Sequence, residues 1–203
     1  MKIAVCTMYS PSYKEVSDVT VPVMRHYCDK HGYEFHEIKI EDDNYHYKKH
    51  EYFKDLLGTD VDVVFYLDCD AIFTNMNTKI ESFLDSRHDF YITRDKTELN
   101  GGVFFLKNTD WVNQWNDFIL FQRVNFPNEQ NCYNHFRNDP HWYKKIKELP
   151  HPSINSYLYE NYVEYGKLTP EEGQWEEGQF ILHVPALHPS KKAEILNNVK
   201  ITE

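Results

Sequence analysis

The chain has 203 residues, of which 41% are hydrophobic and 27% are charged, a length and a balance that fit one compact domain with a buried core. Acidic residues outnumber basic ones by 32 to 22, and the resulting formal charge of −10 argues against a protein that binds the phosphate backbone of nucleic acids. The mean hydropathy is −0.69 and the first residues begin a strand rather than a signal peptide, so we expect no membrane span and a cytoplasmic location, in a host cell if the source is a virus.

The first third of the chain alternates between the hydrophobic patterns of strands and helices. The predicted elements are a strand over residues 2–7 with a loop from Tyr9 onward, a helix over 14–31, a strand over 33–40, a helix ending at Gly58 and a strand over 61–67. The last strand is apolar at nearly every position, which predicts that both of its faces are buried. This order of elements is typical of βαβ units.

The rest of the chain continues the same mixture. The predicted elements are strands over residues 89–93 and 101–106, helices over 111–122 and 129–136, a short strand over 179–183 and a final helix from about residue 190. No internal repeat and no low-complexity linker divides the chain. We therefore predict a single α/β domain over residues 1–203, Rossmann-like, with a central, mostly parallel twisted sheet flanked by helices.

Two acidic residues stand directly after the apolar strand. Asp68 and Asp70 are separated by Cys69, so their side chains project to the same side of an extended chain and repel each other unless a cation lies between them or one is protonated. Ligands of open α/β sheets bind at the carboxyl ends of strands, and oxygen ligands there favour Mg²⁺ or Mn²⁺. The alternative is a strand end whose acidic side chains only face solvent or cap the next turn, because D-x-D alone is a short pattern.

Five motifs together resemble those of the GT-A nucleotide-sugar glycosyltransferases, and in particular the galactosyl-, mannosyl- and xylosyltransferase group. In chain order they are residues 65–75 (FYLDCDAIFTN), residues 99–108 (LNGGVFFLKN) with Trp111, residues 128–130 (NEQ), residues 154–156 (INS) and residues 180–183 (FILH). Their order and spacing extend over residues 3–192. The resemblance implies a GT-A fold, with a nucleotide-binding half over about residues 1–100 and an acceptor-binding and catalytic half over about 101–203.

The resemblance also implies the parts of a metal and donor site. In that family the two acidic residues of D-x-D and a histidine near the C-terminus hold a divalent cation on the donor diphosphate, which makes Asp68, Asp70 and His183 the expected ligands of Mn²⁺ or Mg²⁺. The first strand and its loop hold the nucleotide base. The further residues expected at the UDP-sugar are Thr7, Tyr9, Tyr13, Lys49, Cys69, Asn100, Gly101, Gly102, Lys191 and Lys192.

Several of these residues also have a simple structural interpretation. Gly101 and Gly102 would let the backbone approach a sugar closely, and a β-turn with positive φ explains them equally well. Of Lys191 and Lys192, we expect one at the diphosphate and the other in solvent. His183 ends an apolar strand, where a core histidine is the alternative.

The candidate catalytic residues are Glu129 and Gln130. They begin a predicted helix, where acidic residues commonly cap the end and complement the helix dipole. The family match puts this pair beside the anomeric carbon of the donor sugar. His46 and His50 have the spacing of a helical zinc pair, but no second pair accompanies them, and we interpret both as surface or structural residues.

The sequence departs from the family pattern in two places. The usual members carry an N-terminal membrane helix, which is not seen here, and Ala186 replaces the glycine often found three residues after the C-terminal histidine. In size the chain is similar to the compact GT-A modules of large DNA viruses and bacteria.

The predicted function is metal-dependent transfer of a hexose or deoxyhexose from a UDP-sugar to a hydroxyl of a glycan or glycoconjugate, and the resemblance favours retention of configuration. Two other function classes stay open. Haloacid-dehalogenase phosphatases would use Asp68 as the nucleophile and Asp70 as the acid or base, although their pattern has Thr or Val where this chain has Ile72. A non-catalytic module could bind sugars through exposed aromatic side chains.

Overall fold

A computed structural model describes residues 1–41, 45–95, 98–158 and 173–203. Its centre is a six-stranded sheet in the spatial order β2-β1-β3-β6-β5-β7. The strands of this sheet are β1 (Ile3–Tyr9), β2 (Glu34–Lys39), β3 (Val63–Leu67), β5 (Phe90–Asp95), β6 (Glu98–Lys107) and β7 (Ile146–Glu148). In the described sheet only β6 is antiparallel to its neighbours, so the predicted α/β fold with a mostly parallel sheet is confirmed.

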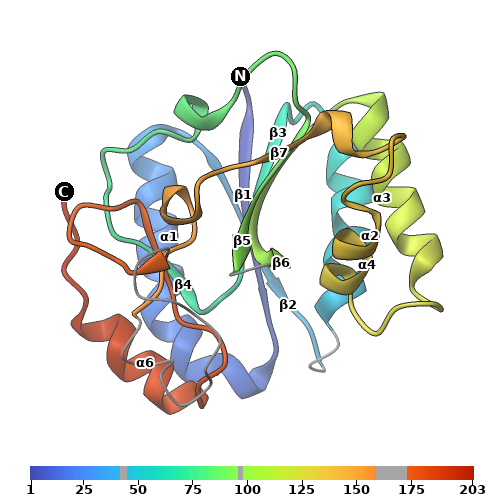
Figure 1. Ribbon diagram of the computed structural model, residues 1–203. Helices are drawn as coiled ribbons and strands as arrows, with labels where there is room; N and C mark the ends of the chain where they lie inside the picture. Colours follow the sequence, from blue (N-terminus) through green and yellow to red (C-terminus); the bar gives the residue numbers. More distant parts are fainter. Residues whose placement is uncertain (42–44, 96–97, 159–172) are drawn as a thin grey trace.

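Helices cover both faces of the sheet (Figure 1). The longer ones are α1 (Lys14–His31), α2 (Tyr45–Leu57), α3 (Asp110–Gln122), α4 (Glu129–Phe136) and α6 (Pro189–Asn198). Helices α1 and α6 lie on one side, and α2, α3 and α4 lie on the other. Single-turn 3-10 helices are η1 (Pro11–Tyr13), η2 (Ile80–Phe83), η3 (Tyr143–Lys145) and η4 (His151–Ser153). None of the helices that the structure describes has the length and apolar character needed to cross a bilayer.

The central strand β3 explains why the site lies where it does. Its alternate side chains enter two separate cores: Tyr66 packs with residues of α2, α3 and α4, whereas Phe65 packs with residues of α1. All five residues of β3 are buried, as its continuous apolar sequence predicts. The first polar residue after the strand, Asp68, therefore emerges at the carboxyl edge of the sheet.

A two-stranded sheet brings the C-terminal part of the chain to the same edge. Strand β4 (Ala71–Phe73) pairs antiparallel with β8 (Ile181–His183), so that Ala71 lies opposite His183. The amide of Val184 donates a hydrogen bond of 2.9 Å to the carbonyl of Asp70. This pairing sets two residues that are more than a hundred positions apart in sequence side by side.

Most predicted elements are confirmed, and two expectations are wrong. The helices over 14–31 and 129–136 have the predicted bounds, and Gly32 is the left-handed C-cap of α1, with φ of 71°. Strand β1 continues through Tyr9, so Tyr9 is a strand residue rather than the start of a loop. Gly101 and Gly102 lie inside β6 without positive φ, which excludes the turn interpretation.

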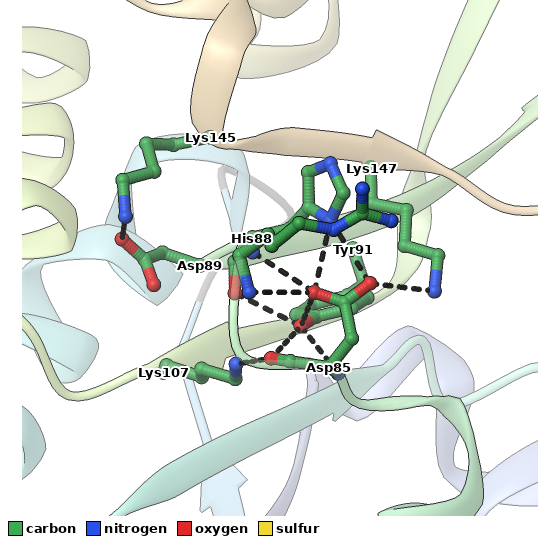
Figure 2. Close-up of polar contacts among 8 residues, drawn as sticks. Asp85, His88, Asp89, Tyr91, Lys107, Lys145 and Lys147 are labelled. Atoms are coloured by element: carbon green, nitrogen blue, oxygen red, sulfur yellow. Dashed lines mark hydrogen bonds and ion pairs between the residues drawn. The ribbon is translucent and has the colours of Figure 1, made fainter.

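A polar cluster secures the opposite, amino edge of the sheet (Figure 2). Asp85 accepts hydrogen bonds from the backbone amides of Arg87 and His88, at 2.9 and 3.0 Å, and lies 3.0 Å from the ammonium of Lys147. The hydroxyl of Tyr91 donates to the Asp85 carbonyl at 2.9 Å. These contacts raise the acidity of Asp85, whose pKa lies far below its ordinary value despite the opposing effect of desolvation. They fix the loop that enters β5.

Candidate active site

Three potential metal ligands converge at the carboxyl edge of the sheet. Asp68 follows β3, Asp70 precedes β4 and His183 ends β8, and one ligand atom of each lies within 4.8 Å of the others. Asp70 and His183 are buried, and Asp68 is half-buried. The Nε2 atom of His183 lies 3.2 Å from Oδ1 of Asp70. The three residues expected from the resemblance to bind a metal are thus gathered in one place.

The ring of His183 is held in an orientation that suits a ligand. Its Nδ1 lies 2.8 Å from Oδ1 of Asn155, whose amide nitrogen donates to the hydroxyl of Tyr157 at 2.9 Å. With the Asn155 oxygen facing it, Nδ1 carries the proton and Nε2 keeps its lone pair. The buried Nε2 makes no hydrogen bond with any group that the structure describes. A lone pair facing a carboxylate oxygen at 3.2 Å calls for a proton or a cation between them, so these residues fit a divalent metal.

The two carboxylates differ in their electrostatics. Burial and the neighbouring charge of Asp70 raise the pKa of Asp68, although the charge of Lys49 opposes them. Burial would also raise the pKa of Asp70, but a proton held between His183 and Asp70, together with the ammonium of Lys192, outweighs it and lowers this pKa to about 2. Asp70 is therefore ionised at neutral pH. The hydroxyl of Tyr66 donates to Oδ1 of Asp68 at 2.7 Å and orients that carboxylate.

Gly102 allows the ligands to approach one another. A Cβ atom at this position would lie 2.6 Å from Cε1 of His183 and 2.7 Å from Oδ2 of Asp68, closer than non-bonded atoms come. The amide of Gly102 donates to Oδ1 of Asn100 at 2.8 Å, which keeps this part of β6 in place. Of the two interpretations of the glycines, close approach of the backbone to the site is the one that the structure supports.

A second buried group of charges lies beside the first. The ammonium of Lys49 is 2.5 Å from Oε1 of Glu129 and donates to the carbonyl of Gly101 at 2.7 Å. His46 lies 3.0 Å from the other oxygen of Glu129. Burial acts to raise the pKa of Glu129, but Lys49 and His46 outweigh it and lower the pKa to about 2. Gln130 accepts a 2.9 Å hydrogen bond from the amide of Gly101.

His46 belongs to this second group of charges, although the sequence analysis did not name it as a candidate. It was interpreted as a surface or structural residue, and its side chain, which is 35% exposed, contacts the buried carboxylate of Glu129. Its three-residue spacing from Lys49 on α2 is the signal that could have identified it, because residues i and i+3 share a helix face.

A small opening adjoins the carboxylates. Its wall is formed by Met8, Tyr9, Ser10, Tyr13, Asp68, Cys69 and Asp70. On the other side of Tyr9, a larger groove of about 380 Å³ runs between α1 and β2. Tyr9 is fixed between the two, since its hydroxyl donates to Oε1 of Glu37 at 2.5 Å. Tyr9 and Tyr13 thus stand where the sequence analysis expects a nucleotide base.

Two of the residues expected at the donor are directed elsewhere. Thr7 is fully buried inside β1 and does not form part of the opening. Cys69 borders the opening, but its side chain packs in an apolar cluster with Val16 and Leu182. Any contact of Cys69 with a ligand would therefore come from its backbone.

The segment after His183 brings one lysine to the site and leaves the other in solvent. Lys192 is buried, with its ammonium 2.5 Å from Oδ2 of Asp70 and 3.2 Å from the hydroxyl of Tyr13. Lys191 is half exposed and pairs with Glu194. Ala186, which replaces the expected glycine, adopts a left-handed conformation with φ of 61°. The backbone therefore keeps the shape that a glycine would favour there.

This architecture, with D-x-D at the end of β3 and an antiparallel strand beside it, is that of the GT-A glycosyltransferase fold. Comparison with known structures supports this assignment. A glycosyltransferase involved in glycosylation of the major capsid of PBCV-1 superposes with a TM-score of 0.74 at 16% sequence identity, covering 97% of this chain and 98% of that one. At this level of identity the likeness establishes the fold.

Two further structures are similar. The apo form of the glycosyltransferase GlyE from Streptococcus pneumoniae TIGR4 has a TM-score of 0.62 and 15% identity, and this chain spans 98% of its own length but 62% of that protein's chain. The galactosyltransferase LgtC, in complex with donor and acceptor sugar analogues, has a TM-score of 0.58 and 10% identity, with 98% and 97% of the two chains covered. Neither protein-family sequence patterns nor curated protein sequences match the chain.

Proposed function

We propose that this protein is a metal-dependent glycosyltransferase that transfers a hexose or deoxyhexose from a UDP-sugar to a hydroxyl of a glycan or glycoconjugate. The observation that carries the proposal is the group of Asp68, Asp70 and His183 at the carboxyl edge of a GT-A fold, in which Nε2 of His183 faces a carboxylate and makes no hydrogen bond within the described part of the chain. An ordinary solvent-facing strand end would not bury two of these three groups.

In this proposal the three ligands hold Mn²⁺ or Mg²⁺. A cation held there would supply positive charge that stabilises the negative charge growing on the diphosphate leaving group. Tyr9 and Tyr13 offer aromatic faces to the nucleotide base at the neighbouring opening. Lys192 lies close enough to Asp70 to contribute its positive charge at the diphosphate.

The sugar is assigned to the side of the site formed by α4. Glu129 is ionised and held by Lys49 and His46, so it cannot donate a proton at neutral pH, and its negative charge suits stabilisation of a cationic sugar. Gln130 is fixed by the Gly101 amide and can position the acceptor. For retention, the acceptor hydroxyl attacks the anomeric carbon from the face that the diphosphate leaves, the bond from this carbon to the diphosphate breaks, and the departing phosphate takes the hydroxyl proton.

The proposal is tested by incubating the protein with a panel of UDP-sugars and simple sugar acceptors, with Mn²⁺ or with EDTA. We expect UDP release from at least one donor with Mn²⁺ and its loss in EDTA. Asp70→Asn should reduce the rate by at least about a hundredfold, since it removes one ligand charge. Asp60→Asn, at an exposed position on the amino side of β3, is the matched control and should retain the rate.

Other outcomes would point to the alternative functions. Release of phosphate from a phosphomonoester, without UDP release from any donor, would favour the phosphatase. Sugar binding without turnover, unaffected by Asp70→Asn, would favour the binding module. The GT-A fold and the contact of His183 with Asp70 give no particular support to either.

A further inference from the structure

Lys192 places a fixed positive charge beside the cluster of Asp68, Asp70 and His183. Its side chain is 2% exposed, and its ammonium lies 2.5 Å from Oδ2 of Asp70 and 4.8 Å from the centre of the Tyr13 ring. Lysine is almost never fully buried unless it is paired. The ammonium is thus held at the site by a carboxylate, a hydroxyl and an aromatic face, all three of which belong to the N-terminal part of the chain.

The ammonium and a divalent cation would share one carboxylate. Oδ2 of Asp70 contacts Lys192, while Oδ1 faces His183 at 3.2 Å, so a cation bound between Asp70 and His183 would share this carboxylate with the ammonium. A divalent cation bound by Asp68, Asp70 and His183 would sit close to a positive charge that cannot withdraw into solvent. Like charges in a buried region repel one another strongly, because little water screens them.

We propose that Lys192, as the fixed counter-ion of Asp70, keeps the divalent cation weakly bound to the free protein. Tight binding of the cation then occurs only together with the donor diphosphate. This inference rests on the proposed function. The negative charge of the diphosphate, added to that of the Asp68 and Asp70 carboxylates, is enough to balance both cations, so the arrival of the diphosphate offsets the repulsion between the metal and Lys192. By thermodynamic linkage, the metal then strengthens nucleotide binding by the same factor by which the nucleotide strengthens metal binding.

Lys191 provides a matched control. It precedes Lys192 on α6 and carries the same charge, but its ammonium pairs with Glu194 in solvent and has no contact with the three ligands among those the structure describes. Removing either lysine changes the net charge equally. Only the loss of Lys192 removes a charge that is buried against Asp70.

The test is a titration of Mn²⁺ into wild-type protein, Lys192→Gln and Lys191→Gln, with and without saturating UDP, followed by the electron spin resonance of unbound Mn²⁺. Without nucleotide, Lys192→Gln should bind Mn²⁺ at least tenfold more tightly than wild type, and Lys191→Gln should stay within twofold. With UDP the gain should disappear, because Lys192 then no longer opposes the metal. Equal Mn²⁺ affinity of wild type and Lys192→Gln without nucleotide would overturn the inference.

The same titration separates this inference from the proposed function. If Mn²⁺ binds to none of the proteins even with UDP, the metal site itself is wrong and both fail. If UDP strengthens Mn²⁺ binding to wild type but Lys192→Gln behaves identically, only the role of Lys192 fails. Should Lys192→Gln unfold because Asp70 is left unpaired, Mn²⁺ should restore cooperative melting, and a variant that stays unfolded with Mn²⁺ contradicts the inference.

Discussion

A single amide side chain determines which nitrogen of His183 faces the carboxylates. Asn155 is fully buried and has its oxygen at Nδ1, and its own orientation is set by the hydrogen bond to Tyr157. The sequence marked residues 154–156 only through the resemblance, with no role for Asn155. Its function as a positioning residue becomes visible only when β8 places His183 beside it, which no local pattern predicts.

We predict that Asn155→Ala weakens Mn²⁺ binding by about ten- to a hundredfold, because the imidazole loses the partner that fixes its tautomer and orientation. Asn155→Asp is the control, since its carboxylate still accepts from Nδ1, and it should bind Mn²⁺ at least as well as wild type. Calorimetric titration with Mn²⁺ in the presence of UDP measures both. Wild-type affinity in Asn155→Ala would show that His183 is positioned without this contact.

Ala186, which the sequence analysis noted only as a replacement for a glycine, has a strained backbone conformation. A left-handed conformation costs an L-residue about 1–2 kcal/mol, whereas glycine adopts it freely. Glycine also gains entropy in the unfolded chain, which offsets about 0.4–1 kcal/mol of the relief. We predict that Ala186→Gly raises the free energy of unfolding by up to about 1.5 kcal/mol in urea denaturation.

The control for this prediction lies on the helix that follows. Ala193 belongs to α6, so Ala193→Gly should lower the free energy of unfolding by about 0.5–1 kcal/mol. If both glycine variants destabilise the protein equally, the φ of Ala186 stores no strain.

At the level of elements, the long helices and the central strand follow from the hydrophobic pattern of the sequence, whereas the short strands β4 and β7 do not. The bounds of α1 and α4 were predicted because apolar spacing and capping residues agree there. Strands β4 and β7 have three residues each and were missed, because three residues carry no period. These strands form because they pair with β8 and β5, respectively. The pairing of β4 with β8 brings D-x-D next to His183.

Helices α2, α3 and α4 are joined by a buried histidine. Nδ1 of His50 lies 2.5 Å from Oδ1 of Asn116, and Nε2 contacts the hydroxyl of Tyr133. Burial lowers the pKa of His50 from 6.5 to about 4, although the contact with Asn116 acts in the opposite direction. His50 was interpreted as a surface or structural residue, and it is buried between three helices on the face of the sheet opposite to α1.

Because of this lowered pKa, the free energy of unfolding decreases as the pH falls. Because the folded protein binds the proton less readily than the unfolded chain, the contribution of a neutral His50 is complete above about pH 6.5 and is lost as the pH falls toward about 4. We predict that wild type loses about 2 kcal/mol more than His50→Gln between pH 7 and pH 5 in urea denaturation. His26→Gln, at an exposed position, should follow wild type, and parallel pH profiles of wild type and His50→Gln would refute the prediction.

At the scale of the whole molecule, the site depends on the return of the C-terminal segment to the first half of the fold. Asp68 and Asp70 follow β3, while His183 and Lys192 come from β8 and α6. The predicted nucleotide-binding half and catalytic half therefore both contribute residues to the proposed metal site. The family resemblance anticipated this convergence, whereas hydrophobic patterns could not, since they report only local structure.

The most direct measurement of the central claim is hydrogen exchange of the backbone amides with and without UDP and Mn²⁺. One ligand held between β3, the end of β1 and the C-terminal segment should increase protection over residues 7–13, 68–70 and 183–192 together, and Asp70→Asn should abolish all three increases. Residues 84–89, at the opposite edge of the sheet, should exchange at the same rate in both states. Protection limited to residues 68–70, with 183–192 unchanged, would contradict a site that includes His183 and Lys192.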